Sequence, residues 1–185
     1  MSFPGSLWNP WRLAYLRDLA ARAKELGGAV SEPDARHSNF IRAYWERPQD
    51  DLANGVVFRN HDGIIFLNLY PYANGHLLVA LGEARPTLQD YSPQQRAAFW
   101  RLVDLGAAAV ERAMNPQGLN IGINQGRAAG AGVPEHLHAH IVPRWAGDTS
   151  FMGAIGGVRL IPDSLDSMAA SLREALAAIG PPPPG

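Results

Sequence analysis

The chain has 185 residues, of which 46% are hydrophobic, with 16 Lys and Arg against 17 Asp and Glu and no Cys. A formal net charge of −1 argues against a general electrostatic affinity for nucleic acid or anionic membranes, and the absence of Cys excludes disulfides, thiolate nucleophiles and sulfur-ligated zinc sites. No secretory signal is visible, and no apolar run reaches the roughly 18 residues of a membrane span. We therefore expect a cytoplasmic protein of one domain, with neither nucleic acid nor membranes as partners.

Residues 1–54 are expected to hold one helix and a surface excursion that packs on the core. Apolar residues recur at helical spacing between Asn9-Pro10, which is a helix start signal, and Gly27-Gly28. The rest of this region lacks periodicity and is rich in turn-forming residues, so it is typical of a long loop. Tyr44 and Trp45 are expected to attach that loop to the core.

Two short β-type runs follow, from Gly55 to Arg59 and from Ile64 to Leu69. They are separated by Asn60-His61-Asp62-Gly63, and Asp-Gly is a strong hairpin signal, so we expect the two runs to pair antiparallel. A turn-rich segment then leads into a third predicted strand, from His76 to Leu81.

A long helix is predicted next, because Ser92 is followed by Pro93 and Gln95 in the pattern of a capping box. Its apolar residues keep to one face as far as Asn115-Pro116. The remaining predicted elements are a strand from Leu119 to Asn124, a strand from His136 to Val142, a helix over residues 163–180 and a proline-rich tail at 181–185.

The order of these elements is not the strict alternation of strand and helix that a parallel sheet requires. We therefore predict an α+β fold with an antiparallel sheet of about five strands and flanking helices. The core of this fold is expected to span residues 55–162.

Three histidines alternate with apolar residues in the segment His136-Leu137-His138-Ala139-His140-Ile141-Val142. On a strand, the side-chain period of two sends His136, His138 and His140 to one face. Half of the six histidines of the chain lie in this segment, so a half-buried strand that carries them by chance is the less favoured interpretation.

Two kinds of chemistry use such a row of imidazoles. Neutral imidazoles bind zinc, iron and copper, and His76, His61, His37 or Glu135 could complete a metal site. Alternatively, one imidazole attacks phosphorus, because a side chain with a pKa of about 6.5 is largely unprotonated at neutral pH, while its neighbours handle protons and charge.

The residues around the histidines favour attack on phosphorus. A Gly-rich segment, residues 125–132, precedes them, and its small residues would let backbone N–H groups approach an anion closely. Arg144 and Trp145 follow them and offer a cation and an aromatic surface for a base. A plain metal site would not need an anion site and a stacking surface beside it.

The histidine motif followed by Pro143-Arg144 resembles the signature of the histidine triad (HIT) superfamily of nucleotide hydrolases and transferases. The segment from Asn68 to Val79 is similar to the superfamily motif Asn-x-x-Pro-x-x-x-Gly-His-x-Leu-Val, and the resemblance extends from about Val56 to Met152. Within the superfamily, the segments from Asn124 to Val133 and from Trp145 to Met152 look most like the bacterial diadenosine tetraphosphate phosphorylase branch.

The resemblance implies roles for individual residues. His138 would be the nucleophile that takes the adenylyl group, with its second ring nitrogen donating to a backbone carbonyl. His136 and His140 would flank it and stabilise charge on the phosphate and on the leaving oxygen, and Asn124 would contact phosphate. The implied substrate-binding residues are Asn68 at the ribose, His76 behind the triad, Trp145 at the base, and the loop residues Gly130, Ala131 and Gly132.

The resemblance also bears on cofactors and assembly. Many members of the superfamily carry a Cys-x-x-Cys zinc site in the region that corresponds to Ser38-Asn39-Phe40-Ile41, and here those cysteines are missing. We therefore expect no structural zinc and no cofactor beyond a divalent metal that accompanies a polyphosphate substrate. The resemblance implies a homodimer or higher homo-oligomer in which the sheet continues across two subunits.

The expected reaction is phosphorolysis of diadenosine tetraphosphate to ATP and ADP, with a purine nucleotide as substrate and inorganic phosphate as acceptor. Water as acceptor would instead give a hydrolase that releases AMP from dinucleoside polyphosphates or nucleoside phosphoramidates. A purine-nucleotide sensor without catalysis stays open, as does a metal-dependent hydrolase with His136, His138 and His76 as ligands.

Overall fold

The computed structural model describes residues 39–148 and 163–180. The helix predicted ahead of Gly27-Gly28, the last part of the 55–162 core and the proline-rich tail lie outside the described residues. Within the described ranges, no helix is long and apolar enough to cross a membrane.

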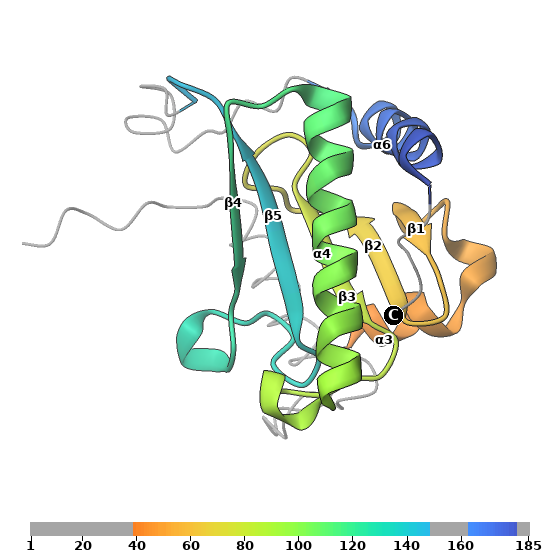
Figure 1. The fold of residues 1–185 in the computed structure, drawn as a ribbon, viewed down its shortest axis with the longest axis vertical. Helices are drawn as coiled ribbons and strands as arrows, with labels where there is room; N and C mark the ends of the chain where they lie inside the picture. Colours follow the sequence, from red (N-terminus) through yellow and green to blue (C-terminus); the bar gives the residue numbers. More distant parts are fainter. Residues whose placement is uncertain (1–38, 149–162, 181–185) are drawn as a thin grey trace, which may run out of the picture.

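The described strands form one five-stranded antiparallel sheet in the order β1-β2-β3-β5-β4 (Figure 1). The predicted α+β fold class is confirmed, and the antiparallel pairing of the first two strands confirms the predicted hairpin. The strands are β1 (Val56–Arg59), β2 (Gly63–Leu67), β3 (Leu77–Leu81), β4 (Gly118–Ile123) and β5 (His138–Arg144).

Helices cover both faces of the sheet (Figure 1). The long helices α4 (Pro93–Met114) and α6 (Leu165–Ile179) pack together on one face, whereas the short α3 (Phe40–Glu46) lies against the other. Three single helical turns complete the described elements: η1 (Pro48–Asp50), η2 (Leu88–Asp90) and η3 (Arg127–Ala129).

The alternation of side chains along the strands builds a hydrophobic core on each face. Val79 and Ile141 point toward α4 and belong to the larger core. Phe66 and Leu78 point the other way, into a smaller core that includes Ile41 of α3. Because β2 and β3 are buried on both faces, their sequences are continuous apolar runs rather than alternating ones.

The long helix α4 begins as predicted. The Ser92 hydroxyl accepts a hydrogen bond from the Gln95 N–H, and the Gln95 side chain accepts one from the Ser92 N–H. Gly106 lets the helix lie close to the sheet, because a Cβ at this position would lie 2.8 Å from Cδ1 of Ile141. The helix therefore packs directly on the strand that carries the histidines.

Part of the predicted surface excursion is helical, because it contains α3 and η1. The only residue of α3 that is buried is Ile41, so this short helix has no repeating apolar face that a periodicity search could find. Tyr44 and Trp45 pack against the smaller core, as expected. The segment is thus attached where the sequence indicated, although its conformation was not predicted.

Arg59 of β1 holds the end of α3 in place. Its guanidinium donates to the carboxylate of Asp51, to the carbonyl of Tyr44 at 2.8 Å and to the carbonyl of Trp45 at 3.0 Å. The same group lies 5.1 Å from the centre of the Trp45 ring. Because carbonyls in a last helical turn lack partners within the helix, the guanidinium satisfies them and ties α3 to the sheet.

The strand β5 continues through Pro143, a residue that cannot donate to a neighbouring strand. β3 pairs with β5 only as far as Ile141, so beyond that point β5 has β4 as its single neighbour. The proline therefore lies where one side of the strand needs no donor.

The start of β5 differs from the prediction. The strand begins at His138, and His136 lies in the turn before it, where its N–H donates to the carbonyl of Val133 at 3.2 Å. The prediction that three histidines share one strand face is therefore wrong for His136. It holds for His138 and His140, which lie level with Ala80 and Leu78 of β3, on the face that α3 covers.

Candidate active site

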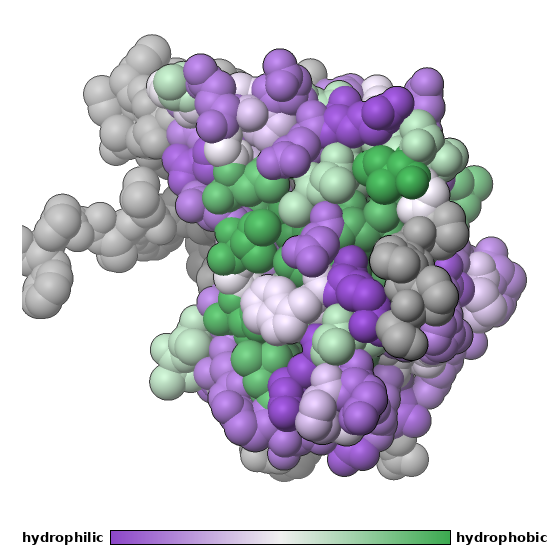
Figure 2. All heavy atoms as spheres, viewed as in Figure 1, coloured by the Kyte–Doolittle hydropathy of each residue, from purple (hydrophilic) through white to green (hydrophobic). Residues whose placement is uncertain are grey.

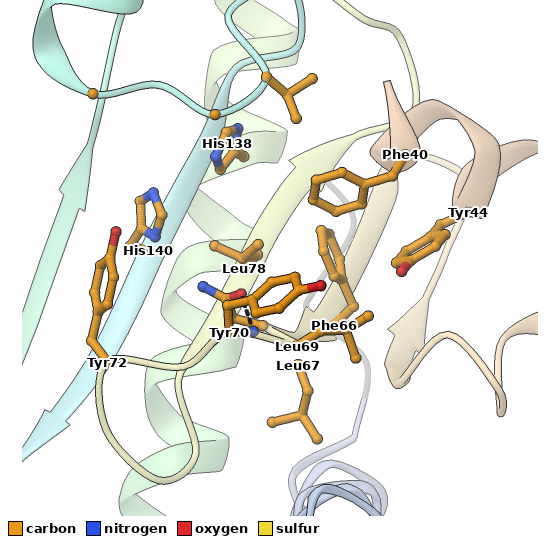
Figure 3. Close-up of a pocket in the computed structure, with 14 residues that line it drawn as sticks. Phe40, Tyr44, Phe66, Leu67, Leu69, Tyr70, Tyr72, Leu78, His138 and His140 are labelled. Atoms are coloured by element: carbon orange, nitrogen blue, oxygen red, sulfur yellow. Dashed lines mark hydrogen bonds between the residues drawn. The ribbon is translucent and has the colours of Figure 1, made fainter. Parts of the chain in front are cut away.

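A pocket of about 320 Å³ opens on the face of the sheet that carries α3 (Figure 3). Its volume is within the range of cavities that hold small molecules. The pocket is lined by Phe40, Tyr44, Phe66, Leu67, Asn68, Leu69, Tyr70, Tyr72, Leu78, Gly130, Gly132, Val133, His138 and His140.

The sheet forms the floor of this pocket. Phe66, Leu78 and His140 lie side by side across three strands, because the strands pair in that register. Phe40 and Tyr44 of α3 form a wall, and their rings meet the Phe66 ring edge-on, with centroids 6.2 and 5.6 Å away. One side of the pocket is thus aromatic and the other carries imidazoles (Figure 3).

The ring of His138 is fixed by the backbone. The residue is only 4% exposed, and its Nδ1 lies 2.8 Å from the carbonyl oxygen of His136. A carbonyl oxygen can only accept, so Nδ1 carries the proton and Nε2 keeps its lone pair. The expected hydrogen bond from the second ring nitrogen to a backbone carbonyl is thereby confirmed.

Burial keeps the imidazoles of this site neutral. Loss of hydration lowers the pKa of His136 and His138, and it lowers the pKa of His140 to about 4, with the charge of His138 adding to the effect. At neutral pH, His138 therefore offers an unprotonated Nε2, which is the form that attacks phosphorus.

His76 is fully buried and contacts His140. Its Nε2 lies 3.0 Å from Nδ1 of His140, and its Nδ1 lies 3.1 Å from the backbone N of Tyr72 and 3.2 Å from Nδ2 of Asn68. The Tyr72 ring stacks on the His140 ring with 17° between their planes. His76 thus touches residues that line the pocket without lining it.

The ring of His136 does not line the pocket. It is fully buried, with Nε2 2.7 Å from the carbonyl oxygen of Leu81 and Nδ1 3.2 Å from Oδ1 of Asn39. The structure therefore gives no support to the expectation that this ring stabilises phosphate charge. What His136 supplies to the site is its carbonyl, which holds the ring of His138.

The Gly-rich loop reaches the pocket through Gly130 and Gly132. Gly130 has a φ of +88°, a conformation that side chains rarely adopt, and its N–H donates to the carbonyl of Arg127. The N–H of Ala131 donates to the carbonyl of Gly126. Because these two N–H groups are used inside the loop, the expected anion cradle does not form at them.

Three other predicted contacts lie outside the pocket lining. The side-chain nitrogen of Asn124 would lie 3.9 Å from a Cβ on Gly130, so this amide faces the loop that lines the pocket. Trp145 lies beyond the end of β5. Arg144, expected to offer a cation, is exposed and bound to Asp148.

The aromatic side of the pocket was missed by sequence reasoning. Phe66 precedes Asn68 by two residues, so strand alternation could have placed both on one face. Tyr70 and Tyr72 lie in the segment that the sequence predicts only as a turn-rich connection. Phe40 comes from α3, for which the sequence carried no periodic signal.

The alternative metal site is not formed. Among residues 39–148 and 163–180, no group of three or more His, Asp or Glu is arranged to hold a metal ion. The proposed ligands His136, His138 and His76 instead have separate hydrogen-bond partners.

Comparisons with known proteins agree with this geometry. A family model described as the HIT domain matches residues 50–147. The AP-4-A phosphorylase of Mycobacterium tuberculosis is 34% identical over 160 residues, which cover 86% of this chain and 77% of that protein. An asymmetrical bis(5'-nucleosyl)-tetraphosphatase of Schizosaccharomyces pombe is 36% identical over 99 residues, or 54% of each protein.

Solved structures share the fold. A zinc-bound histidine triad family protein from Mycobacterium smegmatis superposes with a TM-score of 0.61 at 29% identity, covering 74% of this chain and 94% of that one. A hypothetical histidine triad nucleotide-binding protein from Sulfolobus tokodaii gives a TM-score of 0.61 at 24% identity, covering 74% and 93%, and supports the fold alone. The paired strand histidines, the pocket they line and the match over residues 50–147 lead to one conclusion: the chain belongs to the HIT domain family.

Proposed function

We propose that this protein cleaves dinucleoside polyphosphates through a covalent adenylyl-histidine, with diadenosine tetraphosphate as substrate and inorganic phosphate as acceptor. The observation that carries the proposal is the ring of His138, held through Nδ1 so that the lone pair of Nε2 is available in a pocket. The names of the relatives, a phosphorylase and a tetraphosphatase, support this substrate class.

The aromatic side of the pocket suits a purine base. Phe40, Tyr44 and Phe66 offer ring faces and edges, against which a flat heterocycle packs favourably. A cavity of about 320 Å³ holds one nucleoside and leaves the rest of the dinucleotide outside. Asn68 lines the same pocket, and its amide would bind ribose hydroxyls.

In the first step, Nε2 of His138 attacks the α-phosphorus of the bound nucleotide. The bond between that phosphorus and the bridging oxygen breaks, so ATP leaves and an adenylyl group stays on the ring. The ring becomes positively charged, and its Nδ1–H bond to the His136 carbonyl strengthens as a result.

In the second step, an oxygen of inorganic phosphate attacks the same phosphorus. The bond from Nε2 to phosphorus breaks, ADP is released and His138 recovers its lone pair. Water in place of phosphate would release AMP. A divalent cation would enter with the polyphosphate, whose charge it screens.

The test is product analysis of diadenosine tetraphosphate with and without radiolabelled inorganic phosphate. The expected products are ATP and ADP, formed only with phosphate and with the label in ADP. Formation of AMP and ATP without phosphate would make the protein a hydrolase, and binding without turnover would make it a nucleotide sensor. His61→Asn, which changes an exposed ring outside the pocket, is the matched control.

A further inference from the structure

The hydrogen bonds around His76 determine where its proton lies. The backbone N–H of Tyr72 can only donate, and it is directed at Nδ1 of His76 from 3.1 Å. The Oδ1 of Asn68 accepts from the N–H of Tyr70 at 2.9 Å, so the other end of this amide is its NH2 group. That NH2 group lies 3.2 Å from the same Nδ1. With two donors facing it, Nδ1 of His76 is an acceptor.

The proton of His76 is therefore on Nε2, which lies 3.0 Å from Nδ1 of His140. His76 donates this proton to a hydrogen bond with His140, so Nδ1 of His140 is also an acceptor. The proton of neutral His140 must then lie on Nε2. His138 has the opposite arrangement, because its Nδ1–H donates to the His136 carbonyl.

We propose that Asn68 and the backbone N–H of Tyr72 set the direction of this hydrogen-bond chain, so that His140 presents an N–H group beside the lone pair of His138. Asn68 is then a positioning residue in addition to its proposed contact with ribose. The role of this hydrogen-bond chain in turnover rests on the proposed function. The proton positions on His76, His138 and His140 do not depend on it.

The direction of the chain matters because the substrate is an anion. The rings of His138 and His140 have centroids 5.1 Å apart, so one bound phosphate group can meet both. A donor on His140 stabilises the negative charge that develops on the leaving oxygen, while His138 bonds to phosphorus. With the chain reversed, two lone pairs would face the phosphate and repel it. The hydrogen bond between His76 and His140 stays intact while His140 acts in this way.

The first test measures proton positions in the substrate-free protein by long-range ¹H–¹⁵N correlation of its imidazoles. We expect His76 and His140 to be protonated on Nε2 and His138 on Nδ1. A proton on Nδ1 of His76 in the unmodified chain would overturn the proposal. This reading requires no turnover, so it stands or fails separately from the proposed reaction.

The second test is Asn68→Asp, which keeps an acceptor for the Tyr70 N–H and for ribose hydroxyls but cannot donate to His76. Because the new carboxylate accepts a hydrogen bond more strongly than the Tyr72 N–H donates one, we expect it to draw the proton of His76 onto Nδ1. We then expect kcat to fall about tenfold or more and KM to stay within about threefold. Asn68→Ala, which loses both functions, should also raise KM. An unchanged kcat in Asn68→Asp would overturn the proposal. Asn54→Asp, in the turn before β1, introduces the same charge outside the pocket and is the matched control.

Discussion

His138 owes its reactivity to a backbone atom. The carbonyl of His136 fixes the proton on Nδ1, and burial lowers the pKa of the ring, so Nε2 is unprotonated at neutral pH. No neighbouring base is needed to activate it. The side chain of His136 takes no direct part in this arrangement, which is why the position of its carbonyl counts for more than the chemistry of its ring.

Replacement of this nucleophile tests the reaction directly. His138→Ala is expected to lower turnover of diadenosine tetraphosphate by roughly four orders of magnitude, about 5.4 kcal/mol of barrier, because no other group can form the adenylyl intermediate. Binding of the nucleotide should persist, since the aromatic side of the pocket is unchanged. Single-turnover kinetics and equilibrium binding measure the two effects, and a loss of less than about tenfold would contradict a covalent role.

Stability is expected to decrease with acidification, because three imidazoles, two of them buried and that of His140 half-buried, have lowered pKa values. The pKa of His140 falls from 6.5 to about 4, and those of His136 and His138 fall as well. Above about pH 6.5 the three rings are unprotonated in both the folded and the unfolded chain. Protonation of the unfolded chain then takes nothing from the free energy of unfolding, and the stability that depends on these rings is fully present. As the pH falls below about 6.5, the unfolded chain takes up these protons first and the contribution is lost, in the case of His140 down to about pH 4.

Chemical denaturation at a series of pH values measures this loss. His140→Asn should flatten the decrease, because one of the three rings no longer titrates on unfolding. His61→Asn removes an exposed ring and should leave the decrease as it is. A free energy of unfolding that stays constant across the acid range would show that the three rings are not held neutral by burial.

The pattern of single residues allowed part of the site to be predicted. Asn68, His138 and His140 all line the pocket, and the sequence indicates them because two of them alternate on a strand and the third stands in a recognisable motif. The direction of the His136 ring could not be predicted, because β5 starts two residues later than expected and leaves His136 outside the strand. The later start does not alter the face on which any other residue of the strand lies. The donors around His76 come from a turn, and period-two patterning carries no information about turns.

At the scale of the elements, the side-chain amide of Asn39 contacts both α3 and the turn before β5. Oδ1 of Asn39 accepts from the N–H of Arg42 at 2.9 Å and so caps α3, and it also lies 3.2 Å from Nδ1 of His136. The carbonyl of His136 in turn holds His138. The wall of the pocket and the turn that holds the nucleophile are therefore coupled by their contact with Asn39, which is 5% exposed.

Asn39→Ala removes the cap and this coupling together. The free energy of unfolding should fall by about 1 kcal/mol, the usual cost of a lost N-cap, and kcat should fall severalfold because the His136 carbonyl is less firmly placed. Thermal or chemical denaturation and steady-state kinetics give the two values. The matched control is Ser164→Ala, which removes the cap of α6 outside the pocket. It should cost similar stability and leave kcat unchanged, and equal kinetic effects in the two variants would refute the coupling.

Elements that a local sequence signal marks could be predicted, whereas an element held by contacts between distant residues could not. The hairpin of β1 and β2 and the helix α4 were predicted because a turn signal and a capping box mark them locally. The helix α3 is held by contacts between its Trp45 and Arg59 of β1, which lie apart in the chain. Such contacts exist only once the sheet has formed, so no local pattern records them.

At the scale of the whole molecule, β4 is one of the two edge strands of the described sheet. Most of its residues are exposed, including Ile121 at 45%, and Trp100 on α4 is 44% exposed. Hydrophobic side chains gather over β4 and β5 beside α4 (Figure 2). A long exposed edge with apolar side chains is a surface that pairs with another strand. We propose that a second copy of the chain covers it, which would continue the sheet across two subunits.

A charge at this edge should separate the subunits. Ile121→Arg is expected to shift the protein from dimer to monomer in size-exclusion chromatography with light scattering, because the guanidinium would be buried without a partner. Leu52→Arg, which changes a residue 76% exposed beside the opposite edge strand, should leave the dimer intact. An unmodified chain that is monomeric at working concentration would rule out the proposed assembly.

The composition of the pocket walls has a consequence for chemical inhibition. Rings and aliphatic side chains form most of the lining, and the imidazoles of His138 and His140 are neutral at physiological pH. A compound can therefore gain most of its affinity from stacking and burial of carbon surface, without imitating a polyphosphate. Uncharged aromatic scaffolds, which permeate cells far better than nucleotides do, are the natural starting point for ligands of this protein.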